Sequence, residues 1–256
     1  MINEKRFSVI RGRGMKSMVR AVGSAAQSSS PPRAEVTFRI AALAGWTPDT
    51  EPVSAPAGVP SSLRRRVTPI GRKVLEAAWS VLPQAGEAPR LVLSSRHGEY
   101  ARTMGLLNSL VDEGQVSPAE FSLAVHHALV GLLSIASGNH AGHTAIAAGS
   151  ESFGYGLLEA AVCAAADGRP VVLMHFDEDL PAEYATIEPA GEAAVAVALV
   201  VAPIKHDGGV AVAMSLAPGA AAGGQGLAAS FLEFLHSSQS SAECAGERSN
   251  WLWRRV

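Results

Sequence analysis

Two serines lie near the expected start of a helix, where an acyl-transferring nucleophile could stand. Ser150 and Ser152 follow the apolar run 144–148, and His126 and His143 are histidines that could act as the base. The spacing around both serines departs from the Gly-x-Ser-x-Gly turn of serine hydrolases. Serine is also a preferred capping residue at helix starts. We favour capping, and a stand-alone serine-dependent acyltransferase or thioesterase is the alternative.

Four of the eight histidines, His126, His127, His140 and His143, gather in one part of the chain. His140 and His143 form a compact pair, yet no cysteine or carboxylate stands at a spacing that would complete a zinc site. His126 and His127 point to different sides of the expected helix, so at most one faces a partner or cavity. The glycine-rich stretch 217–226 lacks the Lys and Ser/Thr of a phosphate-binding loop. We therefore expect neither a metal nor a cofactor.

Polar side chains also follow two of the expected strands. Arg96, His97 and Glu99 come after the apolar run 91–94, at a position where loops often carry function. For Arg96 and Glu99 we favour a structural role, in which they fix the turn by hydrogen bonds. The acidic residues 177–179 could bind a cation, although a solvated loop explains them better.

Composition narrows the class of protein. A chain of 256 residues with 48% hydrophobic residues can form one sizeable α/β domain or two small ones. The net charge of -2 argues against a protein that binds nucleic acid through its phosphates. Cys163 and Cys244 are the only cysteines, which indicates no disulfide framework and a reducing, cytoplasmic compartment. No apolar run approaches the roughly 20 residues of a spanning helix, so we expect no membrane span.

The stretch 117–160 predicts a helix, a buried strand and a second helix. Ser117, Pro118 and Glu120 have the arrangement of a capped helix start. The apolar positions of the first helix recur on one face: Phe121, Val125, Ala128, Leu129, Leu132 and Leu133. The strand follows at 144–148, and the second helix is expected to end at Gly168.

The remaining patterns alternate between strand and helix, which is typical of an α/β fold. Strands are expected over 35–44, 91–94, 144–148, 170–176, 193–204 and 210–216, and further helices over 69–85, 100–113 and 227–235. Asp207-Gly208 supplies a tight turn between the last two strands, so we expect them to form an antiparallel hairpin.

We divide the chain into three parts. In residues 1–33 every charged residue except Glu4 is basic, and we expect a disordered tail there. A transit peptide and a gene start placed too far upstream are the alternatives. Residues 34–216 form the domain. Residues 217–256 form a linker and a C-terminal tail with a short helix, a polar loop at 237–250 and the anchoring residues Trp251-Leu252-Trp253.

One segment carries a resemblance to a known family. Residues 94–139 read SSRHGEYARTMGLLNSLVDEGQVSPAEFSLAVHHALVGLLSIASGN. This resembles the β-ketoacyl synthase-like N-terminal domain family, whose members usually read SRHGE, then SPT with FS and SVHNA, before a GxxSI segment. The resemblance spans roughly residues 36–216. It implies an α/β fold that is half of a thiolase-like fold, with a mixed five-stranded sheet and helices packed on it.

Two departures from the family bear on catalysis. Active condensing enzymes of the family place a nucleophilic cysteine at the start of the helix, where this chain has Gly149-Ser150-Glu151. Cys163 lies about three turns further along and cannot substitute. The catalytic histidines come from a second thiolase half, whereas about forty residues follow position 216 here. We therefore expect no catalytic residue, with Ser150/Glu151 at the nucleophile position.

The resemblance implies similarity to chain-length factors of aryl polyene and related polyketide systems. We expect a catalytically silent subunit that pairs with an active β-ketoacyl synthase, meets acyl carrier protein through the complex, and shapes the acyl tunnel in fatty acid or polyketide biosynthesis. A self-associating structural protein is a further alternative. The candidates for lining the tunnel or interface are Phe121, Val125, His126, Phe153 and Tyr155. Relatives tend to have His-Asn where this chain has His126-His127.

Overall fold

A computed structural model describes residues 34–48, 59–180, 184, 193–219 and 226–256, so the expected basic tail 1–33 lies outside the described residues. The strands are β1 (Glu35–Trp46), β2 (Arg90–Ser94), β3 (His143–Ile146), β4 (Val171–Asp177), β5 (Val195–Pro203), β6 (Val210–Pro218), β7 (Ser241–Ala245) and β8 (Ser249–Arg255). The helices are α1 (Ser61–Arg64), α2 (Pro69–Val81), the 3-10 turn η2 (Leu82–Gln84), α3 (Tyr100–Glu113), α4 (Pro118–Leu123), α5 (Ala128–Ser137), α6 (Ser152–Asp167) and α7 (Leu227–His236).

The described strands form one mixed sheet in the order β3-β2-β4-β5-β1-β6-β8-β7. β2 pairs in parallel with β3 and β4, and the other pairs are antiparallel. The sheet therefore has eight strands rather than the expected five. The α/β prediction is confirmed.

The expected hairpin of the last two long strands is wrong, because β1 lies between β5 and β6 and pairs with both. The connection between β5 and β6 passes close to β1. A Cβ on Gly209 would clash with the Ile40 carbonyl oxygen, and Arg39 Nε donates to the Ile204 carbonyl at 2.9 Å. The tight turn predicted at Asp207-Gly208 thus joins two strands that flank a third.

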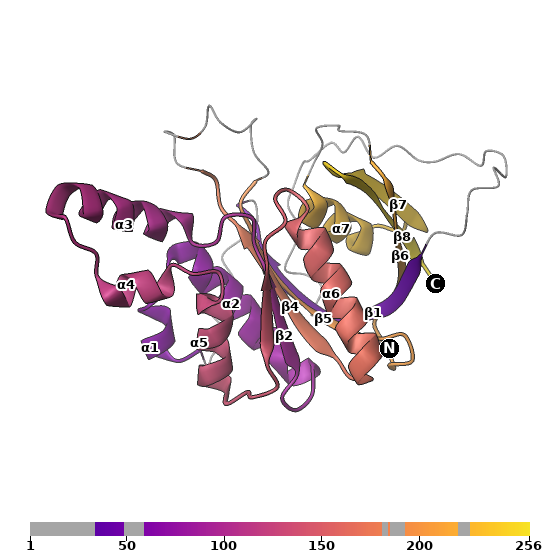
Figure 1. The fold of residues 1–256 in the computed structure, drawn as a ribbon. Coiled ribbons are helices and arrows are strands. Elements are labelled where there is room, and N and C mark those ends of the chain that lie inside the picture. Colours follow the sequence, from indigo (N-terminus) through magenta and orange to yellow (C-terminus); the bar gives the residue numbers. More distant parts are fainter. Residues whose placement is uncertain (1–33, 49–58, 181–183, 185–192, 220–225) are drawn as a thin grey trace.

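Helices cover both faces of the sheet, α2 and α5 one face and α6 and α7 the other (Figure 1). Strands buried on both faces need apolar side chains at every position rather than at alternate ones. β4 and β5 follow this pattern, with buried residues along almost their whole length. Two hydrophobic clusters result, one on each side of the sheet.

The C-terminal hairpin, formed by β7 and β8 with the turn 246–248, extends the sheet beyond β6. The expected polar loop at 237–250 is therefore wrong from Ser241 onward. Trp251 and Trp253 anchor the hairpin as expected, because both indoles are buried in the cluster that contains Phe231 and Phe234 of α7. Residues 226–256 thus contribute to the same core as the preceding strands.

The helix expected from Ser117 is two helices, α4 and α5, separated by four residues. Its start is as predicted, because the Ser117 hydroxyl accepts a hydrogen bond from the Glu120 N–H at 3.4 Å. The Glu120 carboxylate pairs with Arg102 of α3 instead of returning to the helix start. Among the described helices, none is long and apolar enough to cross a bilayer.

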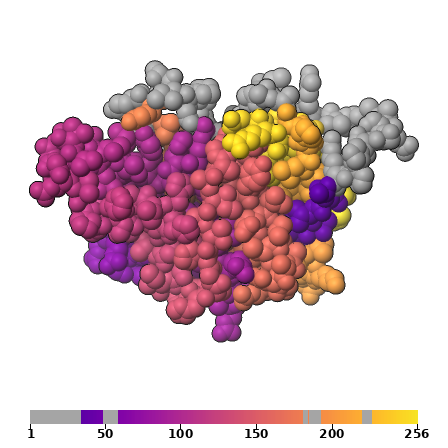
Figure 2. Space-filling model, viewed as in Figure 1, coloured from indigo at the N-terminus to yellow at the C-terminus, as the bar shows by residue number. Residues whose placement is uncertain are grey.

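α3 and α4 project from the body of the molecule, and we call residues 100–125 the α3–α4 arm (Figure 1; Figure 2 shows it standing out at the left). Both helices are described throughout, and neither contains a buried residue. The exposed large apolar side chains of the arm are Leu107, Leu110, Val111, Val116, Phe121 and Val125. An amphipathic helix whose apolar face meets solvent is incomplete without a partner.

Candidate functional site

The turn between β3 and α6 occupies the place where the sequence suggested chemistry. The Ser152 hydroxyl accepts from the Ala148 N–H at 2.9 Å and donates to the Gly149 carbonyl at 2.7 Å, which closes the turn. The Ser150 hydroxyl donates to Glu247 Oε2 at 3.3 Å. Both serines thus have structural contacts, but neither caps α6 in the expected manner, because the cap residue is Glu151 and its side chain makes no cap bond.

Glu151 is buried, with 1% of its surface exposed, although it is a carboxylate on a turn. Its Oε1 accepts three hydrogen bonds from the C-terminal hairpin: from the Arg248 N–H at 3.2 Å, the Ser249 N–H at 2.9 Å and Trp251 Nε1 at 3.2 Å. Bonds to a charged acceptor are among the stronger ones in proteins. The carboxylate therefore joins the start of α6 to the end of the chain.

Next to this contact, α6 and Trp251 approach each other closely. A Cβ on Gly154 would lie 2.6 Å from Trp251 Cζ2, so only glycine fits there without a shift. The Tyr155 ring packs edge-on against the indole with centroids 5.2 Å apart.

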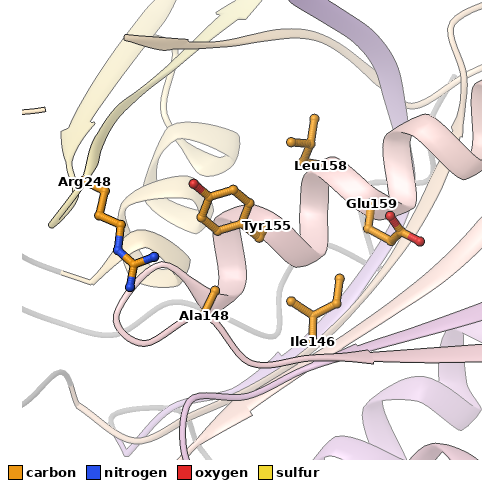
Figure 3. Close-up of a pocket in the computed structure, with 6 residues that line it drawn as sticks. All are labelled: Ile146, Ala148, Tyr155, Leu158, Glu159 and Arg248. Carbon is orange, nitrogen blue, oxygen red and sulfur yellow. The ribbon is translucent and has the colours of Figure 1, made fainter. Parts of the chain in front are cut away.

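An open cavity of about 380 Å³ lies beside this contact, between β3, α6 and the C-terminal hairpin. Figure 3 shows Tyr155 and Leu158 extending from α6 on one side, Ile146 below them, and the charged groups of Arg248 and Glu159 at opposite ends. The lining residues are Ile146, Ala148, Tyr155, Leu158, Glu159 and Arg248. An apolar wall between two charged ends could take a chain-like apolar group or a side chain of another protein.

On the other side of α6, a buried polar network joins the ends of β2 and β4. His175 Nδ1 lies 3.0 Å from Ser94 Oγ, and His175 Nε2 lies 3.5 Å from Asp177 Oδ2. Burial lowers the pKa of His175, although Asp177 and the Ser94 carbonyl oppose this. The order of groups is that of a Ser-His-Asp triad, but Ser94 is fully buried and a Cβ on Gly156 would lie 2.6 Å from its hydroxyl. Because Ser94 and His175 are buried by their neighbours, we assign the network a structural role.

Comparison with known proteins identifies the family. Residues 39–254 match the family described as β-ketoacyl synthase, N-terminal domain. The chain belongs to this family. The match extends into β8, so it reaches beyond the region in which the sequence pattern was recognised. No curated protein matches the chain.

Solved structures of ketosynthases have the same thiolase-like fold. The chain is similar to a chain in the complex of the ketosynthase ApeO with its chain length factor ApeC from Xenorhabdus doucetiae, with 23% identity, TM-score 0.74, and coverage of 86% of this chain and 100% of that one. It is also similar to a chain in the AntDE:AntF ketosynthase and acyl-carrier protein complex, with 13% identity, TM-score 0.57, and coverage of 72% of this chain and 70% of that one. For a chain of the ishigamide ketosynthase/chain length factor, the identity is 12% and the TM-score 0.51, and the match covers 72% of this chain and 67% of that one.

In this ketosynthase-like chain, the two aromatic tunnel candidates lie on different sides of the first turn of α6. Tyr155 lines the open cavity. Phe153 is 2% exposed and points into the core, where its ring contacts His175 at 5.2 Å and Phe231 at 5.6 Å between centroids. The two residues therefore do not share one wall.

The other candidates lie at the arm. Phe121 and Val125 are exposed. His126 directly follows the arm, and its ring lies against Gly98 in the segment Ser95–Glu99 that matches the family's SRHGE. His127 and His143 approach with ring centroids 5.7 Å apart. In the part of the chain that the structure describes, no three His, Cys, Asp or Glu side chains are grouped so that they could hold a metal ion.

The family's SRHGE segment is fixed by carboxylates. Asp177 Oδ1 accepts from Ser95 Oγ at 3.0 Å and from the Arg96 N–H at 2.7 Å. The expectation of a solvated loop at 177–179 is therefore wrong for Asp177, which ends β4. Glu99 has the structural role that we favoured, since it accepts from the Thr68 N–H at 3.0 Å.

Sequence reasoning named Glu151 without its partners, and it did not single out His175. Glu151 meets donors about 100 residues away in sequence, and His175 meets Ser94 across 81 residues. A glutamate at a helix start and a histidine inside an apolar strand were the visible signals. An isolated ionisable residue in an apolar strand indicates a buried partner, because an unpaired polar group there is unfavourable.

Proposed function

We propose that this chain is a catalytically silent, chain-length-factor-like subunit that pairs with an active β-ketoacyl synthase in fatty acid or polyketide biosynthesis, of the aryl polyene type. The observation that carries the proposal is the identity of the residues in the turn before α6. Where condensing enzymes of the family have a nucleophilic cysteine, this chain has Ser150 and the buried carboxylate of Glu151. A carboxylate that accepts three internal hydrogen bonds is poorly placed to attack a thioester.

The stand-alone serine enzyme has less support. Ser150 donates to a glutamate, and among its described contacts there is no histidine that could take its proton. His143 begins β3, at the opposite end of that strand from Ser150. Cys163 does not replace the nucleophile, because burial raises the pKa of its thiol and leaves less of the reactive thiolate.

The α3–α4 arm supports a protein partner. Val111 is 83% exposed and Phe121 61%, and apolar side chains gathered in this way on a projecting arm usually mark an interaction surface. Among the described residues, β3 is the last strand of the sheet next to β2, and an edge strand of this kind can pair with another chain. We propose that the ketosynthase covers the arm and the β3 edge, and that carrier protein meets the complex so formed.

The cavity supports a role in shaping the acyl tunnel. Tyr155, Leu158 and Ile146 form an apolar wall next to β3, where the proposed partner would close the open side. A wall of this kind limits chain length by its shape alone. Of the two aromatic candidates, Tyr155 carries this part of the proposal, because Phe153 lies beneath the wall in the core.

The test is co-expression with a candidate ketosynthase, followed by size-exclusion chromatography with light scattering. We expect a stable 1:1 complex that is lost in Phe121→Asp and Val125→Asp. Val256→Asp is the matched control, because Val256 is as exposed as Phe121 but lies at the end of β8. In the complex, Tyr155→Trp is expected to shorten the acyl product.

Three results would contradict the proposal. A chain that condenses malonyl units on a carrier protein without a partner is not silent. A homodimer that ignores every ketosynthase tried would favour the self-associating alternative. A complex unaffected by both arm variants would place the interface elsewhere.

A further inference from the structure

The position of the missing nucleophile has contacts that catalytic silence alone does not require. Loss of a cysteine needs only a substitution, whereas Glu151 is buried and receives three hydrogen bonds from the C-terminal hairpin. We propose that Glu151 is a latch that holds this hairpin closed over the first turn of α6. The inference goes beyond the proposed function and is independent of it, because every contact lies within one chain.

The donors of the latch are arranged as a receptor for one carboxylate oxygen. The backbone N–H groups of Arg248 and Ser249 are consecutive, and they converge on Glu151 Oε1 together with Trp251 Nε1. Consecutive N–H groups in a turn form a concave site for an anion. The hairpin turn leaves room for this carboxylate, because a Cβ on Gly246 would clash with Glu151 Oε1.

The second oxygen of Glu151 makes the latch releasable. Glu151 Oε2 is buried and has no hydrogen-bond partner among the described residues. A buried oxygen without a partner is unfavourable, and it regains hydrogen bonds to water when the hairpin opens. The three bonds to Oε1 thus favour the closed state, while the desolvated Oε2 opposes it.

The latch also sets one wall of the cavity. Arg248 lines the cavity, and its own N–H is one of the three donors. Trp251 supports Tyr155 on the opposite wall. The shape next to β3 therefore depends on whether the hairpin is closed.

The chain contains its own probe of opening. Cys244 lies on β7 and is buried, and Cys163 is the only other cysteine. In a Cys163→Ser background, the rate at which iodoacetamide labels Cys244 in the isolated full chain reports opening of the hairpin. We expect labelling to be about tenfold faster in Glu151→Ala, which loses the acceptor of three bonds. Glu151→Gln keeps one acceptor oxygen and should show a smaller increase.

Glu247→Ala is the control, because Glu247 is an exposed glutamate in the same turn and its carboxylate accepts a hydrogen bond from the Ser150 hydroxyl rather than from the hairpin. Its labelling rate is expected to stay within twofold of the parent. Hydrogen exchange separates local from global opening: amides of Arg248 and Ser249 should exchange faster while those of β2 and β4 keep their protection. The latch is refuted if Glu151→Ala labels at the parent rate, or if protection falls equally throughout the sheet. Should Glu151→Ala fail to fold, Glu151→Gln and Trp251→Phe decide by the same two readouts.

Discussion

Ser152 and Phe153 in the first turn of α6 are buried, whereas α3 and α4, which are described throughout, contain no buried residue. The first region joins distant parts of the chain through Glu151, Trp251 and their hydrogen bonds. The second joins its own two helices through the ion pair of Arg102 and Glu120, and it meets the body near the start of α3, where Arg102 donates to the Arg66 carbonyl and the Ala101 N–H donates to Glu178. In a condensing enzyme the first region would have to admit substrate.

The difference indicates where this chain can interact. Buried polar contacts fix the turn before α6 in one arrangement, so this region adds stability and shape. The arm keeps apolar surface in water, which is unfavourable for an isolated chain and favourable once a partner covers it. Substitutions should therefore affect folding in the first region and association in the second.

The largest difference between the two regions is expected when one aromatic side chain in each is truncated to alanine. Trp251→Ala removes a fully buried indole and should lower the free energy of unfolding by about 3–5 kcal/mol. Phe121→Ala should change it by less than about 0.5 kcal/mol in the isolated chain. Urea denaturation of both variants measures this, and equal losses would remove the contrast between the regions.

A smaller effect is expected from adding a methyl group to a glycine in each region. Gly154→Ala places a Cβ 2.6 Å from Trp251 and should lower the free energy of unfolding by about 1–3 kcal/mol. Gly105→Ala, within α3, meets nothing within 4 Å and should raise it by up to about 1 kcal/mol through helix propensity. Thermal melting of the two variants should shift in opposite directions, and a shared direction would contradict the close approach of α6 and Trp251.

The closed region should also make stability depend on pH. Burial lowers the pKa of His175, while the unfolded imidazole returns to a pKa near 6.5. Below that pH the unfolded chain binds the extra proton, so stability falls as pH falls, by up to about 1.4 kcal/mol per pH unit, until the folded pKa is reached. Urea midpoints between pH 7.5 and 5.5, values chosen to bracket the ordinary pKa, should show this decline, and His175→Gln should reduce it. An unchanged slope in His175→Gln would assign the decline to other groups.

The smallest effect is expected at Ser150, whose hydroxyl bonds to the exposed Glu247. Ser150→Ala should change the free energy of unfolding by less than about 0.5 kcal/mol. After incubation with an acyl thioester, mass spectrometry should detect no acyl adduct on Ser150. The test compares the parent with Ser150→Ala, in which an adduct on this serine would be lost. Such an adduct would support the serine enzyme instead.

Local signals in the sequence predicted local structure well. The helix over 100–113 is confirmed with its left-handed Gly114 at the end, and α6 stops at Gly168 as expected. These features depend on spacing and on residues a few positions apart. The family motif likewise identified the family that the comparisons show.

Features that depend on distant partners were not predictable. β7 has few apolar residues, yet it pairs with β8, and its Cys244 lies opposite Trp251 in the core. Periodicity also says nothing of strand order, so the position of β1 between β5 and β6 was missed. The role of Glu151 was hidden for the same reason, since its donors are far away in sequence.

The position of β1 has a consequence for synthesis of the chain. Arg39 of this first strand bonds to Ile204, 165 residues later, and β6 completes its pairing only at Val210–Pro218. Contacts between such distant residues form slowly, because a long loop must close before they are made. At roughly 5–20 residues per second, a ribosome needs tens of seconds to supply both partners of β1. During that time both edges of β1 are unpaired. The nascent chain should therefore depend on chaperones more than its size suggests.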